Sequence, residues 1–165
     1  MYELRRILVP LDGSSESEQA LPIATALAKR FDSEVLLLRV LDTPMPSLLE
    51  SKAEALWIRE AIQYRQRELE LYLQAHEATL AQDGVQARHV VHDNSPAEDI
   101  LWVASSEPAD LIVMASHGEG GATRWSSGSV ADKVLQHSPC PVLLVRVATE
   151  GTISDTSKRF GRLAA

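Results

Sequence analysis

The feature that most limits the fold is a series of short apolar runs separated by segments with helical periodicity. The runs occupy residues 6–11, 34–41, 85–92, 111–115 and 142–147. The first two are apolar almost throughout, which is typical of strands covered on both faces, as in parallel sheets between two layers of helices. Strands that alternate with helices therefore predict an α/β fold. Right-handed crossovers would lay helices on both faces of a mostly parallel, five-stranded open sheet, giving three layers.

Helix signals fall between the runs. Ser14, Ser15 and Ser17 are competing N-caps for a helix that continues to Phe31. Pro22 lies inside that segment and predicts either a late helix start or a kink, because proline is tolerated in the first turn and disruptive deeper in a helix.

A long helical segment ends near Asp83, before Gly84. Its second half has a regular apolar stripe that includes Leu69, Leu73 and Leu80. In its first half Trp57 lies among other adjacent apolar residues, so this part predicts a break in the helix or a surface that faces a partner.

Two further helices follow. Ser95, Pro96 and Glu98 predict a helix start with a capping box. The last helix is expected to begin near Ser129, and its predicted buried side chains are Val130, Val134 and Leu135.

Length and charge exclude several classes of protein. The chain has 165 residues, a net charge of −7 and a pI near 5.2. An acidic chain does not favour nucleic acid or an anionic membrane surface as a partner. No apolar run reaches the ~20 residues that span a bilayer, and a cytoplasmic location is expected. Cys140 is the only cysteine, so we expect no intrachain disulfide and interpret it as a small buried packing residue and not a nucleophile.

The connection between the fourth run and the last helix is rich in glycine and polar residues. It begins after Ala115 and leads to Gly128 and Ser129. A glycine-rich turn at a helix N-terminus leaves backbone N–H groups pointing outward, where aligned peptide dipoles favour an anion. The segment therefore predicts a phosphate site, although its spacing matches neither a Walker A loop nor the GxGxxG fingerprint.

The same segment resembles the nucleotide-binding motif of universal stress proteins, Gly-x2-Gly-x9-Gly-Ser/Thr. In this chain the motif is Ala115-x2-Gly118-x9-Gly128-Ser129, with alanine at the position of the first glycine. The resemblance to this UspA-like family covers about residues 4–147. It implies a Rossmann-like fold, similar to the adenine nucleotide alpha hydrolases, with strand order 3-2-1-4-5 and a nucleotide at the switch between the first and fourth strands.

The resemblance implies that the chain binds ATP or a related adenine nucleotide as a stress-response sensor or regulator and is not a conventional enzyme. Mg²⁺ would arrive with the phosphates. Asp12 would bond to the ribose or adenine, the Val40 main chain would contact the adenine edge, and Arg124 would contact the phosphates. The expected nucleotide-binding residues are Pro10, Leu11, Asp12, Val40, Met114, Ala115, His117, Gly118, Arg124, Gly128, Ser129 and Val130.

Four of these residues also have ordinary structural interpretations. Asp12 can form a turn, Val40 can be a core residue, His117 can be a loop histidine, and Arg124 can be a solvated loop arginine. No residue is expected to be catalytic or to bind a metal directly, because no nucleophile–base set or metal-ligand spacing is present.

Two other functions remain alternatives. Ala115 suggests a dimeric scaffold that kept the fold, lost the ligand and interacts with partner proteins. An ATP-dependent ligase-like or FMN-binding enzyme would share the architecture, but the sequence lacks an SGGxDS-type loop.

The domain is expected to span residues 1–148, with a flexible tail at 149–165. Its final strand, from Val142 to Val147, is long and apolar for a sheet edge. Pairing with a second copy through this strand, as the family implies, would give a homodimer.

Overall fold

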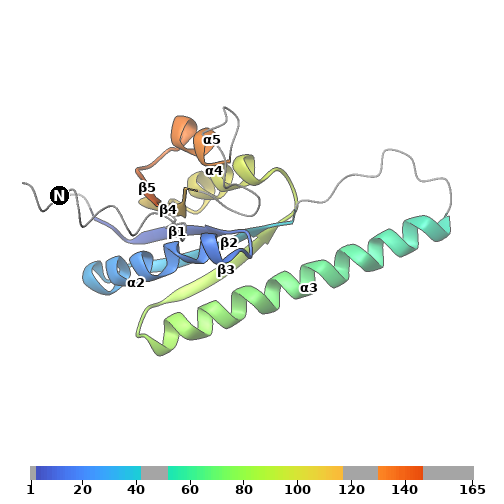
Figure 1. Ribbon diagram of the computed structural model, residues 1–165, viewed down its shortest axis with the longest axis horizontal. Coiled ribbons are helices and arrows are strands. Elements are labelled where there is room, and N and C mark those ends of the chain that lie inside the picture. The colour runs from blue at the N-terminus through green and yellow to red at the C-terminus, as the bar shows by residue number, and fades with distance from the viewer. Residues whose placement is uncertain (1–2, 42–51, 117–129, 147–165) are drawn as a thin grey trace, which may run out of the picture.

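The computed structural model describes residues 3–41, 52–116 and 130–146. Within these residues strands alternate with helices along the chain (Figure 1). The strands are β1 (Arg6–Leu11), β2 (Glu34–Val40), β3 (Ala87–His92), β4 (Leu111–Ala115) and β5 (Val142–Val145). The helices are α1 (Ser15–Glu18), α2 (Ala20–Phe31), α3 (Lys52–Gln82), α4 (Pro96–Ser106) and α5 (Val130–His137).

The strands form one sheet in the order β3-β2-β1-β4-β5. Every pair of neighbouring strands is parallel, which confirms the predicted fold class and strand order. Helices α2 and α3 cover one face of the sheet, and α4 and α5 cover the other (Figure 1). Along the chain, β1, β2 and β3 are added toward one edge of the sheet, and β4 and β5 are then added on the other side of β1. The order of the strands therefore reverses between β1 and β4.

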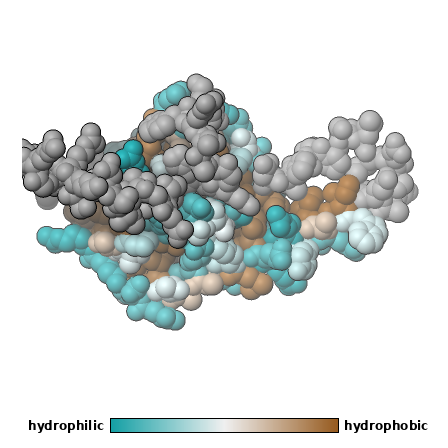
Figure 2. Space-filling view, viewed as in Figure 1, coloured by the Kyte–Doolittle hydropathy of each residue, from teal (hydrophilic) through white to brown (hydrophobic). Residues whose placement is uncertain are grey.

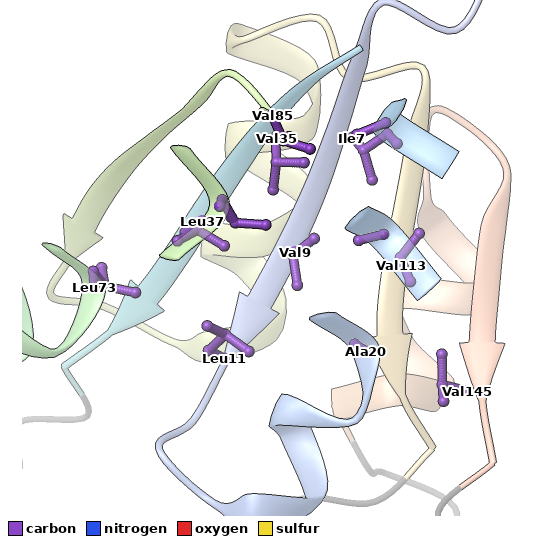
Figure 3. Packing of buried hydrophobic residues seen from close by; sticks show 13 residues of the cluster. Ile7, Val9, Leu11, Ala20, Val35, Leu37, Leu73, Val85, Val113 and Val145 are labelled. Carbon is purple, nitrogen blue, oxygen red and sulfur yellow. The ribbon is translucent and has the colours of Figure 1, made fainter. Parts of the chain in front are cut away.

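The core consists of two apolar layers, one on each face of the sheet. Along β1 the fully buried residues Ile7 and Val9 belong to the layer under α2 and α3 (Figure 3), whereas Leu8 belongs to the layer under α4 and α5. Because successive side chains point to opposite faces of a strand, two covered faces require an uninterrupted apolar run. This requirement explains the sequence of β1 and β2.

A network of charged side chains connects the amino ends of the strands. The Glu34 carboxylate accepts hydrogen bonds from Arg6 Nε at 2.6 Å and from Arg88 Nε at 2.9 Å, and Arg88 Nη2 donates to Glu107 at 2.6 Å. These bonds join β1, β2 and β3 to the end of α4. They lie at the opposite end of the sheet from the predicted nucleotide site.

The first helical segment is divided in two. Ser14 is the N-cap of α1, and its side chain accepts a hydrogen bond from the Ser17 N–H. α1 ends at Glu18, and α2 begins after Gln19. Pro22 therefore lies in the first turn of α2, where its missing N–H costs no helical hydrogen bond.

The start of α4 was predicted correctly, but its cap differs from the capping box expected at Ser95. Ser95 is the N-cap, yet its side chain makes no capping hydrogen bond. Instead, the carboxylate of Asp99, a residue that is only 6% exposed, accepts a hydrogen bond from the Asn94 N–H at 3.0 Å.

Two predictions for the last helix and strand were wrong. Val130 and Leu135 are 37% and 42% exposed, because α5 turns Ala131 and Val134 toward the sheet instead. β5 ends at Val145 and not at Val147, so the edge strand is shorter than predicted. Residues 147–165, including the predicted tail, lie outside the described residues.

Candidate functional site

The candidate site lies where β1 and β4 separate. Their pairing is restricted to Ile7 with Leu111 and Leu8 with Ile112. On either side the ladders continue further, from β1 to β2 as far as Leu11 and from β4 to β5 as far as Ala115. The two central strands therefore diverge at their carboxyl ends, at the point where the order of winding reverses. Such switch points are where open α/β sheets bind ligands.

The turn after β1 is held by its own side chains. Asp12 Oδ1 accepts hydrogen bonds from the Ser14 N–H at 2.9 Å and from the Ser14 hydroxyl at 2.5 Å. The Asp12 N–H donates in turn to Ser17 Oγ at 3.3 Å. The turn-forming role of Asp12 is thus present in the structure, and it fixes the carboxylate at the carboxyl end of β1.

Arg39, on β2, is a positioning residue that the sequence interpretation missed. Its Nη1 donates to the Leu11 carbonyl at 3.2 Å, and its guanidinium lies 6.0 Å from the ring centre of Tyr72 on α3. Gly13 has φ +83°, and a Cβ at this position would lie 3.1 Å from Arg39 Nη2. Arg39 therefore packs against the Asp12–Gly13 turn from the α3 side. The only sequence signal for it is an arginine inside the apolar run of β2.

Tyr72 connects this arrangement to α1. Its hydroxyl donates to Glu18 Oε1 at 2.8 Å. Burial, reinforced by the hydrogen bond to Glu18, raises the pKa of Tyr72 above its ordinary value. The turn is thus supported by contacts from β2, α1 and α3 together.

The opposite side of the separation carries apolar residues. Val40 is the last residue of β2 and lies in register with His92 of β3, while the ladder to β1 ends one residue earlier, at Arg39. Val40 and Met114 belong to the layer under α4 and α5, and Pro10 is half-buried at the end of β1. Leu11, 4% exposed, lies on the other face.

The last helix begins at the same end of the sheet. Val130 is the first residue of α5, which follows the connection from β4. The residues predicted within that connection, namely His117, Gly118, Arg124, Gly128 and Ser129, lie outside the described residues. The structure therefore brings Pro10, Asp12, Val40, Met114 and Ala115 to one edge, with the start of α5 at the same edge.

Comparison with known proteins identifies the family of this chain. Residues 3–146 match the Universal stress protein family. The chain belongs to that family. A relative from Methanocaldococcus jannaschii, the universal stress protein MJ0531, is 34% identical over 145 residues, covering 86% of this chain and 82% of the relative.

Solved structures of other family members share the fold of this universal stress protein. UspA from Lactobacillus plantarum has a TM-score of 0.75 at 24% identity, covering 87% of this chain and 99% of the other. A universal stress protein in complex with cAMP has a TM-score of 0.65 at 18% identity, covering 88% and 99%. A family protein from Arabidopsis thaliana with AMP bound has a TM-score of 0.60 at 18% identity, covering 92% and 97%.

The position of Ala115 bears on the variant motif of this universal stress protein. Ala115 ends β4, pairs with Val145 and is 8% exposed. Among the described residues other than glycine, only Asp32 has a positive φ, so the backbone at Ala115 does not require glycine. Residues two apart share a face of a strand, which places the methyl group on the side of Val113 and opposite to Met114.

Other kinds of site find no support in the part of the chain that the structure describes. Within residues 3–41, 52–116 and 130–146 no group of His, Cys, Asp and Glu side chains is arranged to hold a metal ion. No described helix is long and apolar enough to cross a membrane. Cys140 is half-buried beside the α4 and α5 layer, and burial raises the pKa of its thiol, which disfavours the nucleophilic thiolate.

Proposed function

We propose that this universal stress protein binds an adenine nucleotide, ATP in the first place, where β1 and β4 separate, and that it acts in the cytoplasm as a stress-response sensor or regulator. The observation that carries the proposal is that three features lie at the carboxyl ends of the strands, namely the fixed Asp12 carboxylate, the end of β2 at Val40 and the start of α5. The cAMP and AMP complexes of proteins with the same fold support an adenine ligand.

Each part of the nucleotide has a matching part of the proposed site. The adenine would lie against Pro10, Val40 and Met114, with the Val40 main chain at its polar edge. Asp12 would accept a hydrogen bond from the ribose. The phosphates would lie toward the motif glycines and the N-terminus of α5, where peptide dipoles favour an anion.

The charge balance determines how the phosphates must be held. With a net charge of −7, the protein as a whole does not attract a nucleotide, so affinity depends on local donors and on Arg124. Mg²⁺ would be held mainly by the phosphates, as magnesium in nucleotide sites commonly is. We propose binding, and not rapid turnover, as the functional event.

The proposal is tested by titrating the protein with ATP, ADP and AMP in a calorimeter, with and without Mg²⁺. We expect saturable heat with at least one of them. In the same samples the melting temperature should rise, because a ligand that binds only the native state adds about 2.7 kcal/mol of stability at a concentration 100 times Kd. Absence of both effects would contradict nucleotide binding and favour the dimeric scaffold that interacts with partner proteins.

Ala115→Gly tests whether the alanine in the motif blocks the nucleotide, which is the basis of the scaffold alternative. Since the Ala115 methyl is buried in a regular strand, we expect ATP affinity to change by less than about threefold and the free energy of unfolding to fall by about 0.5–1 kcal/mol, the usual cost of glycine in a strand. Calorimetry and denaturant unfolding measure the two quantities. An affinity that rises tenfold or more would mean that the methyl group blocks the ligand.

We also propose a homodimer through β5. In the described sheet β5 is an edge strand, and Val142, Leu143 and Leu144 are only half-buried. An uncovered apolar edge favours pairing with another strand. Light scattering on a Leu143→Lys variant tests this, since an unchanged mass would contradict an interface at β5.

A further inference from the structure

Helix α3 carries two stripes of apolar side chains, and only one of them contacts the sheet. The inner stripe contains Leu69, Leu73 and Leu80, which are 8%, 0% and 4% exposed. The outer stripe, defined here as Trp57, Tyr64 and Leu71, is 77%, 67% and 60% exposed. Large apolar side chains in a row on one exposed face are a sign of an interaction surface.

The outer stripe has the spacing of a helix–helix contact. Its three residues are spaced seven positions apart. Around a straight helix, residues seven positions apart are rotated by about 20° from one to the next, and a row with this spacing is typical of two helices that pack with a left-handed twist. Figure 1 shows α3 running well beyond the edge of the sheet, and Figure 2 shows apolar side chains along this projecting part. Leu56, 57% exposed, adds to the apolar area beside Trp57.

We propose that the outer stripe is a self-association surface, on which α3 of a second copy lies antiparallel about a two-fold axis through Tyr64. Around such an axis each residue faces the partner residue that lies the same number of positions from Tyr64 in the opposite direction. Trp57 then packs against Leu71 of the partner, Leu71 packs against Trp57 of the partner, and the two Tyr64 rings meet at the centre. One surface that complements itself is what a symmetric dimer requires.

Charges beside the stripe select this direction. Glu60 and Arg67 are exposed and lie along the same flank of the outer stripe. Neither forms an ion pair with another described residue. In the antiparallel pair Glu60 lies beside Arg67 of the partner, twice by symmetry. A parallel pair would place this flank of the two copies on opposite sides of the contact, so Glu60 could not reach Arg67 of the partner.

The fold leaves room for the second helix. Leu71 points away from the sheet, because it is half a turn from both Leu69 and Leu73, whose side chains are buried. The partner helix would therefore lie on the solvent side of α3. α3 packs on β3 and β2, at the opposite edge of the sheet from β5. This surface is consequently independent of any pairing through β5.

Crosslinking tests the axis. In a Cys140→Ser background, Tyr64→Cys places the new thiols of two copies opposite each other, and we expect oxidised glutathione to give a disulfide-linked dimer at least about tenfold faster than for Arg59→Cys. Arg59 is exposed on the same helix but on another side of it, so it controls for random collision. Equal rates for the two variants would overturn the proposal.

Charge reversal tests the direction of pairing. We expect Glu60→Arg alone, or Arg67→Glu alone, to raise the dissociation constant of the α3 contact on the order of tenfold, and the double reversal to return it to within about threefold. Sedimentation equilibrium measures the constant, and circular dichroism checks that each variant stays helical. If the double variant associates as weakly as the single variants, the proposal is wrong. It is also wrong if Trp57→Glu leaves the self-association of the protein unchanged, or if the wild-type protein does not associate.

Discussion

Gly128→Val is expected to lower the affinity for ATP by about 100-fold or more, equivalent to about 2.7 kcal/mol of binding free energy. Gly128 is the last glycine of the motif and precedes Ser129 and α5. Glycine close to a helix N-terminus lets phosphate oxygens approach backbone N–H groups, and a branched side chain would occupy that space. Calorimetric titration with ATP measures the loss.

The matched control is Gly121→Val, which lies in the spacer of the same motif. It adds the same side chain to the same connection at a position with no assigned role, so its affinity should stay within about threefold of wild type. Melting temperatures of both variants without ligand monitor the fold. An unchanged affinity in Gly128→Val would place the nucleotide elsewhere, even if the wild-type protein binds ATP.

Gly13→Ala should both destabilise the protein and weaken nucleotide binding. At φ +83° an L-residue costs about 1–2 kcal/mol. The added Cβ would also lie 3.1 Å from Arg39 Nη2, which displaces the guanidinium from the Leu11 carbonyl at an additional cost of about 1 kcal/mol. We expect denaturant unfolding to show a loss of about 2–3 kcal/mol, and ATP affinity to fall about tenfold because Asp12 moves with the turn.

Gly84→Ala is the control for backbone strain alone. Gly84 has φ +79°, but no atom lies within 4 Å of the position that an alanine Cβ would take, and it is remote from the proposed site. The variant should lose about 1–2 kcal/mol of stability and retain ATP affinity. In an Arg39→Ala background the cost of Gly13→Ala should fall to that of Gly84→Ala. If the difference in stability loss between Gly13→Ala and Gly84→Ala is the same with Arg39 and in the Arg39→Ala background, the Arg39 side chain does not hold the turn.

The elements of this protein were largely predictable because their signals are local. Apolar runs in β1 and β2 indicated strands covered on two faces, and Pro96 marked the start of α4. The order of the strands came from the family resemblance and is confirmed by the pairing. Of the predicted site residues, Asp12, Val40 and Met114 lie at the edge where β1 and β4 separate, because they are at or next to the carboxyl ends of strands that run in the same direction.

Other features depended on contacts between residues far apart in the chain. Arg39 supports a turn that lies 26 positions earlier at Gly13, and periodicity in β2 carries no sign of that partner. The exposure of Val130 and Leu135 depends on how α5 is rotated against the sheet, which a short amphipathic helix does not determine by itself.

The sequence by itself determined which segments are strands and helices, that the sheet is covered on both faces, and that a glycine-rich segment precedes the last helix. Backbone preference and side-chain period act over a few residues, so one chain read in order is sufficient for them. Only the tertiary structure decided that β1 and β4 diverge after Leu8, that Arg39 packs on Gly13, and that Trp57, Tyr64 and Leu71 remain outside the core. These are outcomes of packing, where each side chain takes the space that distant neighbours leave.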